Sequence, residues 1–286
     1  MSSFSVLNNI PSLNGQNQLY VNNLNLATTL NRLASGKRIN TGADDAAGLQ
    51  IADSLRGNVM ALNQSARNAS DGIGFLQIAD GALEQITALL HRAVTLATEA
   101  ESEIISPDGK NALDQEFSNI MAEINRIKTD TNFNGTQIFG GKLDGINSLA
   151  GTTGCDSNSL EIFVGDMTMT SSYISVKIGT FAASDLMGST GISTGGATSL
   201  AALKSGLNKV AILRGDVGAG MNRLQAAINV IKVTAMNTQA AESGIRDADM
   251  AAEISNLTKY QILAQTGMAA LSQANSNMQN VLSLLR

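Results

Sequence analysis

The chain has 286 residues and a net charge of −5, and it contains no Trp, three Tyr and seven Phe. The acidic balance, without a basic patch interleaved with aromatic residues, argues against a nucleic-acid-binding protein. A single cysteine excludes an intrachain disulfide. The sequence contains no run of about 18 apolar residues, so it predicts no membrane-spanning helix.

The first predicted element is an uncharged helix within residues 1–31. This stretch holds no Asp, Glu, Lys or Arg, and an apolar row with a seven-residue spacing passes through it: Leu19, Leu26 and Leu33. Such heptads are typical of a helix that pairs with another helix. Where a solvated helix usually carries Lys and Glu, this arm carries uncharged polar side chains such as Asn22, Asn23 and Asn25, which can be buried when they are hydrogen-bonded. We therefore expect this arm to be covered by partners.

A break between two helices is predicted next, at residues 34–45. Gly36 and Gly42 interrupt the first helix, while Thr41, Asp44 and Asp45 supply an N-cap and negative charge for the following one. No histidine lies nearby, so we interpret the paired aspartates as capping residues rather than as a metal or acid–base site.

The longest periodic segment runs from Asp45 to about Ser102. Its heptad row continues without interruption through Leu55, Leu62, Ala69, Leu76, Leu83 and Leu90. At 1.5 Å per residue this helix would be roughly 80 Å long, so it needs an equally long partner.

A second helix is predicted to fold back on this one. Ser106 and Pro107 form a turn that also begins a helix. The helix of about 20 residues is amphipathic through Leu113, Phe117, Ile120, Ile124 and Ile127. It ends before Asn134-Gly135, which predicts a tight turn.

Residues 141–198 differ in composition from the preceding helices, because they are rich in Gly and Ser. Two short runs, Leu160–Val164 and Tyr173–Ile178, predict the strands of a hairpin. A helical spacing of apolar residues then resumes after the insert. Its heptad row comprises Val210, Val217, Leu224 and Ile231. We expect this helix to pair with the long helix before the insert, so that the middle of the chain loops out.

The last element is again uncharged, over residues 260–285. One heptad row comprises Leu257, Ala264, Leu271, Met278 and Leu285, and an interleaved row comprises Ile254, Met268 and Leu282. We predict that this arm pairs with the N-terminal arm and then with copies of the same chain. The alternative is that both ends are flexible polar tails, since isolated helices of this kind are marginal in water.

No catalytic, metal or cofactor site is predicted. His91 is the single histidine, and Cys155 lies in a Gly/Ser-rich loop without a neighbouring base. Gly215, Gly218 and Gly220 lack the Lys-Ser/Thr of a phosphate-binding loop.

Several motifs resemble the signatures of bacterial flagellins. The N-terminal motifs are Leu33–Leu49, which contains Ala34-Ser35-Gly36-Lys37-Arg38-Ile39-Asn40 and Asp44-Asp45-Ala46-Ala47-Gly48, and Phe133-Asn134-Gly135. The C-terminal motifs are Ile245–Asp249, Gln261–Leu263, Gln273–Asn275 and Gln279–Arg286. The resemblance covers about the first 140 and the last 90 residues, whereas the central insert matches nothing familiar.

Pattern and resemblance predict a mainly α fold. Its long antiparallel helical bundle and coiled coil are formed by paired N- and C-terminal segments, with a small central insert that contains a β-hairpin. The resemblance implies that residues 1–40 with 245–286 form a coiled-coil domain lining a tube. Residues 41–140 with 199–244 would form a surrounding helical shell, and residues 141–198 an outer insert.

The resemblance also implies a subunit of the extracellular flagellar filament. Such a subunit leaves the cell unfolded through the flagellar type III channel, with an export chaperone on its C-terminal arm, and meets junction and cap proteins. The first residues lack the basic and apolar regions of a Sec signal peptide, which agrees with export without cleavage.

A further family property is recognition by an innate immune receptor through the long helix. By position, Arg92 and Glu116 match charged residues of that surface, and Leu96 with its neighbour Ala97 matches apolar ones. Val94 and Thr95 stand where the family usually has Arg and Glu. We therefore hypothesise weakened receptor binding.

Three alternatives stay open. A hook–filament junction protein shares the same pairing of the two ends, although the Val281–Arg286 ending favours a filament subunit. A secreted enzyme would carry its site in the insert. A coiled-coil translocator that inserts into membranes is disfavoured, because Ala and Asn interrupt the apolar rows.

Overall fold

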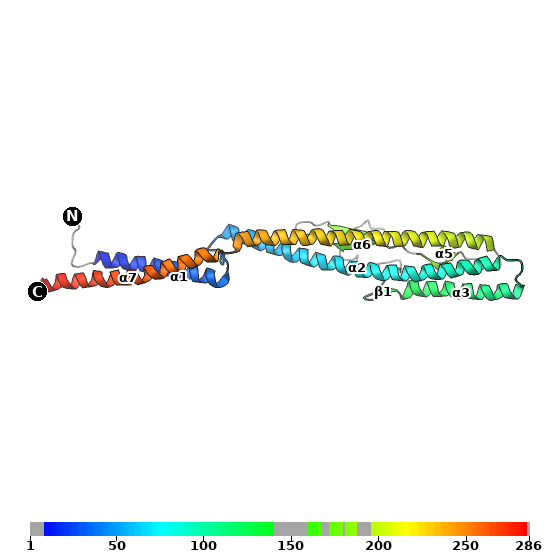
Figure 1. The fold of residues 1–286 in the computed structure, drawn as a ribbon, viewed down its shortest axis with the longest axis horizontal. Helices are drawn as coiled ribbons and strands as arrows, with labels where there is room; N and C mark the ends of the chain where they lie inside the picture. The colour runs from blue at the N-terminus through cyan, green and yellow to red at the C-terminus, as the bar shows by residue number, and fades with distance from the viewer. Residues whose placement is uncertain (1–8, 140–158, 167–171, 180, 188–195, 285–286) are drawn as a thin grey trace. The chain divides into compact units, whose positions relative to one another are not determined.

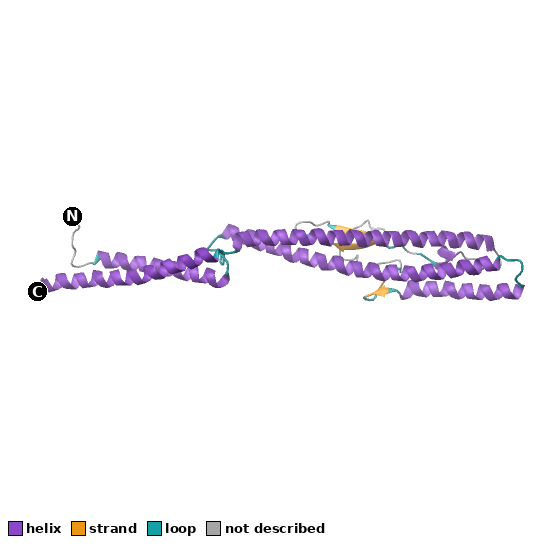
Figure 2. Ribbon diagram, in the orientation of Figure 1, coloured by secondary structure: helices purple, strands orange, loops and turns teal. Residues whose placement is uncertain are grey.

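The computed structural model describes residues 9–139, 159–166, 172–179, 181–187 and 196–284. Long helices dominate it, as predicted, and the two hairpins lie in the middle of the sequence (Figures 1 and 2). The helices are α1 Ile10–Ser35, α2 Ala46–Ala100, α3 Pro107–Asp130, α5 Ala183–Met187, α6 Gly196–Arg246 and α7 Met250–Leu284. The strands are β1 Asn132–Phe133, β2 Thr136–Gln137, β3 Ser159–Phe163 and β4 Tyr173–Lys177. The predicted fold class is confirmed.

The chain divides into two compact units. The terminal unit comprises residues 1–57 and 237–286, and the central unit comprises residues 58–236. The described part of the insert, including β3 and β4, belongs to the central unit. The three-part division into tube, shell and outer insert stays a prediction.

In the terminal unit, α1 and α7 lie side by side (Figure 1). The less exposed positions of α1 alternate in steps of three and four: Ser12, Gly15, Leu19, Asn22, Leu26, Thr29 and Leu33. Those of α7 follow the same rhythm: Glu253, Leu257, Tyr260, Ala264, Gly267, Leu271 and Ala274. This spacing is that of a two-helix coiled coil, and we call these two sets the α1–α7 interface.

The two segments that connect this pair to α2 and α6 hydrogen-bond to each other in an isolated antiparallel bridge that pairs Lys37 with Asp247. Gly36 ends α1 in the left-handed conformation, with a φ of 68°. The backbone N–H of Arg38 then donates to the carbonyl of Arg246 at 2.7 Å, and that of Ala248 donates to Gly36 at 2.9 Å. The predicted capping role of Asp45 is confirmed, because its carboxylate accepts a hydrogen bond from the Gly48 N–H at 2.9 Å.

The core of the central unit is a continuous apolar cluster between α2, α3 and α6. Leu76, Leu83 and Leu90 of α2 are fully buried in it, as are Val210 and Leu224 of α6. An ion pair adds to this packing, because Arg214 Nε of α6 lies 2.8 Å from Asp80 Oδ1 of α2. The hydrogen bond to Asp80 raises the pKa of the Arg214 guanidinium.

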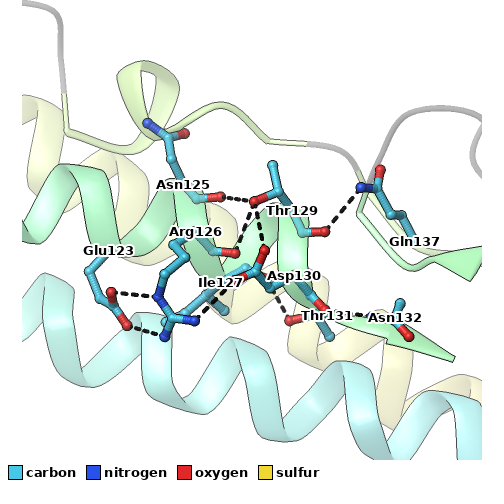
Figure 3. A network of polar contacts seen from close by, with 9 residues as sticks. All are labelled: Glu123, Asn125, Arg126, Ile127, Thr129, Asp130, Thr131, Asn132 and Gln137. Atoms are coloured by element: carbon cyan, nitrogen blue, oxygen red, sulfur yellow. Dashed lines mark hydrogen bonds and ion pairs between the residues drawn. The ribbon is translucent and has the colours of Figure 1, made fainter. Parts of the chain in front are cut away.

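The helix α3 begins and ends with polar caps. Ser106 accepts a hydrogen bond from the Gly109 N–H, and Pro107 is its first residue, as the sequence predicts. At the other end, Arg126 lies between Glu123 and Asp130, and the Gln137 amide donates to the Thr129 carbonyl at 3.0 Å (Figure 3). The network fixes the chain as it leaves the helix for β1.

The two hairpins differ in their role. The turn between β1 and β2 places Asn134 and Gly135 at positive φ, 50° and 81°, which explains the Asn-Gly pair. The larger hairpin pairs β3 with β4 and packs on the helices through Ile162, which lies against Gly72, and Val176, which lies against Gly220. The expectation that the middle of the chain loops out as an outer insert stays a prediction. Within the central unit, this hairpin adds its buried face to the core, because two helical glycines leave room for it.

Candidate functional site

The described residues contain no group of three or more His, Cys, Asp or Glu side chains that could hold a metal ion, and His91 is exposed on α2. Cys155 lies outside the described residues. Among the described helices, none combines the length and the apolar character of a membrane span. The candidate functional site is the surface of the α1–α7 pair.

Leucines of each helix pack over glycines of the other in the α1–α7 interface. A Cβ atom on Gly267 would lie 2.8 Å from Leu19 Cδ2, and one on Gly15 would lie 3.2 Å from Leu271 Cδ1. These distances mean that each glycine is the floor of a hole that a leucine fills. The backbones of α1 and α7 can approach closely because these positions lack side chains.

Polar side chains complete the same interface. The Asn22 amide donates to the Tyr260 carbonyl at 2.9 Å, and the Ser12 hydroxyl donates to Asn275 Oδ1 at 3.0 Å. Asn22 and Ser12 are both buried. These bonds let polar residues be buried without the cost of unpaired groups.

The interface contains a group of charged residues near the C-terminal end of α1. The Arg32 guanidinium lies 3.6 Å from Glu253 Oε1 and 3.7 Å from Asp44 Oδ1. Glu253 is only 8% exposed. The pKa of the Asp44 carboxyl is held below its ordinary value, chiefly because it accepts hydrogen bonds from the N–H groups of Thr41 and Asn40.

The outer sides of α1 and α7 expose large apolar side chains, each between 44% and 64% exposed. We call this set the outward apolar face: Ile10, Leu13, Tyr20, Val21, Leu24, Leu30, Met250, Ile254, Ile262, Leu263 and Met268. No charged residue occurs between positions 10 and 31 or between 260 and 284. Exposed apolar side chains in this number on one pair of helices are typical of a surface that another molecule covers.

A groove of about 510 Å³ runs along this pair of helices. Its lining mixes apolar residues with uncharged polar ones and includes Val21, Asn25, Leu263 and Thr266. Lys259 is the charged residue among the described lining residues. Such a surface can accept another uncharged helix without burying unpaired charges.

The structure divides the residues of the predicted assembly seam into three groups. The first group is half-buried in the α1–α7 interface: Leu19, Leu26, Leu33, Leu257, Ala264 and Leu271. Ile254 and Met268 lie on the outward apolar face. The side chains of Met278 and Leu282, and the whole of Leu285, lie outside the described part. Sequence reasoning missed Gly15, Gly267 and Glu253, although both glycines keep the heptad spacing.

The residues predicted for the shell helices are mostly buried in the central unit. Leu55 is half-buried, and the others are buried: Leu62, Leu76, Leu83, Leu90, Val210, Val217, Leu224 and Ile231.

The residues matched to a receptor surface do not form one exposed patch. Arg92 and Glu116 are joined by an ion pair with Nη2 and Oε1 2.7 Å apart. Leu96 and Ala97 are buried in the apolar core of the central unit. A partner of the folded protomer therefore reaches the ion pair but not Leu96.

Comparison with known proteins gives consistent matches over almost the whole chain. The family model of the bacterial flagellin N-terminal helical region matches residues 6–144, and that of the C-terminal helical region matches residues 200–285. The flagellar filament 31.3 kDa core protein of Treponema maltophilum is 36% identical, with 97% of this chain and 98% of that protein covered. A flagellin of Halalkalibacterium halodurans is 35% identical over the same shares.

A solved structure, that of Bacillus cereus flagellin, is 24% identical and has a TM-score of 0.48 over 62% of this chain and 94% of its own. The family models match the segments that form the paired helices, and these two relatives match 97% of this chain. The protein belongs to the bacterial flagellin family.

Proposed function

We propose that this chain is the structural subunit of a flagellar filament and polymerises with copies of itself outside the cell to support swimming. Flagellin relatives that are named as filament core proteins support the proposal. So does a protomer that carries uncharged helical surface at both ends of its sequence. Contacts between different surfaces of identical subunits, when they do not close into a ring, produce an open helical polymer.

The observation that carries this proposal is the small core of the terminal unit. Among its described residues, only Ile39 and Ala52 are buried hydrophobic residues, whereas large apolar side chains of α1 and α7 face the solvent. A helix pair with so little buried surface gains most of its stability when other molecules cover it. Burial among identical copies would provide that cover.

The test replaces one residue of the outward apolar face. Ile262→Asp places a charge where 55% of the side chain is exposed, away from the α1–α7 interface. We expect the monomer to keep its helical content but to lose seeded polymerisation, because the charge would be buried between copies. Electron microscopy and sedimentation measure filament formation, and Ile262→Leu is the matched control that should polymerise normally. Filaments of normal yield from Ile262→Asp would refute the assignment of this face.

A second substitution tests the pairing itself. Leu271→Asp introduces a charge next to Gly15 inside the α1–α7 interface. We expect it to separate α1 from α7 and to stop polymerisation, while the central unit keeps its unfolding transition. A variant that still forms filaments would show that the pairing is not needed for assembly.

Growth on seeds also distinguishes a filament subunit from a junction protein. Continued elongation from filament fragments is expected of a filament subunit. A chain that adds to fragment ends and then stops would instead fit a junction protein.

The remaining partners follow from family membership and form part of the proposal. The chain would be exported unfolded through the flagellar type III channel, with a chaperone on its C-terminal arm, and would contact junction and cap proteins. Two uncharged ends that can separate from each other are compatible with these steps. Within the assembled subunit, residues 1–40 with 245–286 would line the tube, 41–140 with 199–244 would form the shell, and 141–198 would face outward. A pull-down with the chaperone should lose its signal when residues 245–286 are removed.

We propose that receptor recognition depends on the exposed Arg92–Glu116 pair. Val94 and Thr95 offer neither of the charges that the family usually presents there. We propose weak receptor activation, which a cellular reporter assay against a potent flagellin would measure. Equal potency would contradict it.

A further inference from the structure

The turn between α2 and α3 exposes an isoleucine that the fold does not use. Ile104 is 95% exposed, the largest exposed fraction among the large hydrophobic residues that the structure describes. Its neighbour Ile105 turns inward, since its Cγ2 atom lies 2.7 Å from where a Cβ of Gly109 would be. One isoleucine therefore packs against the start of α3, while the other points into solvent. An apolar side chain so placed costs solubility without stabilising the protomer.

Two carboxylate residues precede this side chain in the same turn. Glu101 and Glu103 are exposed on the same turn. Within the described part of the chain, neither carboxylate makes a hydrogen bond or an ion pair. The turn is therefore an apolar knob with a negative rim, and we call Glu101–Ile104 the turn knob.

A groove of complementary character lies on the same unit. It has a volume of about 450 Å³ and lies between α2 and the first turns of α6. The described residues that line it are Val94, Leu200, Ala201, Lys204 and Leu207. Val94 and Leu207 form its floor, because they pack against the core. We call it the Leu200 groove.

The rim of the Leu200 groove carries a single positive charge among the described lining residues. That residue is Lys204, which is exposed. Its ammonium group makes no ion pair or hydrogen bond within the described part of the chain. The groove thus presents an apolar floor with a positive rim, opposite in charge to the turn knob.

We propose that the turn knob of one copy docks in the Leu200 groove of a second copy. Ile104 fills the apolar floor, and Glu101 or Glu103 pairs with Lys204. The exposure of Ile104 shows that it does not occupy the groove of its own chain. Each docked pair leaves one free knob and one free groove, so the contact is heterologous and propagates along an open polymer. The inference rests on the proposed filament function and names one place where neighbouring copies meet.

The first test removes the knob. Ile104→Ser is expected to raise the critical concentration for seeded polymerisation by roughly 10- to 100-fold, the factor that corresponds to burying one isoleucine. Ile212→Ser is the matched control, because Ile212 is also an exposed isoleucine of the central unit but belongs to neither surface. It should change the critical concentration by less than about threefold.

The second test reverses charges. Lys204→Glu alone is expected to hinder assembly, and the combination with Glu101→Lys and Glu103→Lys should restore it, because the rims become complementary again. All these residues are exposed, so the monomer variants should keep the unfolding midpoint of the unmodified chain.

The outcomes separate the two proposals. If the unmodified chain forms filaments and Ile104→Ser has an unchanged critical concentration, the docking proposal is wrong and the filament function stands. Failure of the triple charge reversal to restore assembly also refutes the docking. If the unmodified chain forms no filaments on seeds, the filament function fails and the docking fails with it.

Discussion

Gly206 of α6 lies against the backbone of α5. A Cβ on this residue would overlap the carbonyl oxygen of Leu186, a backbone atom that cannot rotate away. Gly215 lies on the same helix with nothing within 4 Å of its Cβ position. A close backbone contact therefore requires a glycine at position 206, whereas no contact requires one at position 215.

This difference predicts opposite effects of the same substitution. Gly206→Ala should destabilise the central unit by about 1–3 kcal/mol, because the helices must move apart. Gly215→Ala should stabilise it by about 0.5–1 kcal/mol, since alanine restricts the unfolded chain and favours helix. Chemical denaturation followed by circular dichroism measures both. Equal effects of the two substitutions would contradict the assigned contact.

The low pKa of the Asp44 carboxyl predicts a pH dependence. A carboxyl whose pKa is lowered by folding stabilises the folded state above its ordinary pKa of about 3.9, and this contribution is lost as the pH falls through the folded value. Asp44→Asn should therefore lower the unfolding temperature at pH 7. The difference from the unmodified chain should shrink when both are compared near pH 3.

Thermal unfolding at the two pH values checks this prediction. The charged acceptor is needed because it receives the N–H groups of Thr41 and Asn40. A constant difference between the two proteins from pH 7 to pH 3 would show that the charge of Asp44 is not responsible.

At the scale of the elements, the pairing of α1 with α7 was only half visible in the sequence. One row of each helix was predicted, because leucine and alanine at heptad spacing are readily recognised, as in Leu19 or Leu271. The second row escaped prediction, since Gly267 and Glu253 are not apolar residues. The position of this row depends on a steric fit, because each leucine of one arm packs where the other arm has a glycine.

The same limit explains why the sequence did not show that the interleaved row lies outside the α1–α7 interface. Ile254 and Met268 have the hydrophobicity of interface residues, but they lie on the outward apolar face. In a helix whose every side is uncharged, hydrophobic periodicity no longer distinguishes the side that meets the partner helix.

The ion pair at the end of α1 yields a prediction about this element. Arg32→Met leaves the buried carboxylate of Glu253 without its counterion, so we expect the α1–α7 pair to lose about 1–3 kcal/mol. Glu253→Gln added to Arg32→Met should recover part of that loss. Hydrogen exchange of the amides in the first turns of α7 reports it.

Arg126→Met is the matched control for this prediction. Arg126 makes two ion pairs on α3, but its side chain is 60% exposed, and exposed pairs contribute little. Its loss should cost less than about 1 kcal/mol. A larger effect at Arg126 than at Arg32 would mean that burial of the pair does not set its contribution.

At the scale of the whole molecule, the long helices and the hairpin followed from the sequence. The uninterrupted leucine row of α2 and the Asn134-Gly135 turn are strong local signals. The packing of the larger hairpin was not visible in the sequence, because it depends on Gly72, which is 90 residues from Ile162, and on Gly220, which is 44 residues from Val176. Residue spacing cannot show which distant side chain a helical glycine receives.

The contrast between the two units leads to a last prediction, about hydrogen exchange in the free subunit. The central unit has an extensive apolar core, whereas the described terminal unit buries only Ile39 and Ala52 among its hydrophobic residues. Local opening costs least where little apolar surface is buried, so amides of α1 and α7 should exchange much faster than those of α2 between Leu76 and Leu90. In filaments, the outward apolar face would be covered, and α1 and α7 should become protected. Mass spectrometry of both states measures this change. Equal protection of the two regions in the free subunit would mean that the terminal unit is stable alone, and unchanged exchange in filaments would mean that assembly does not bury it.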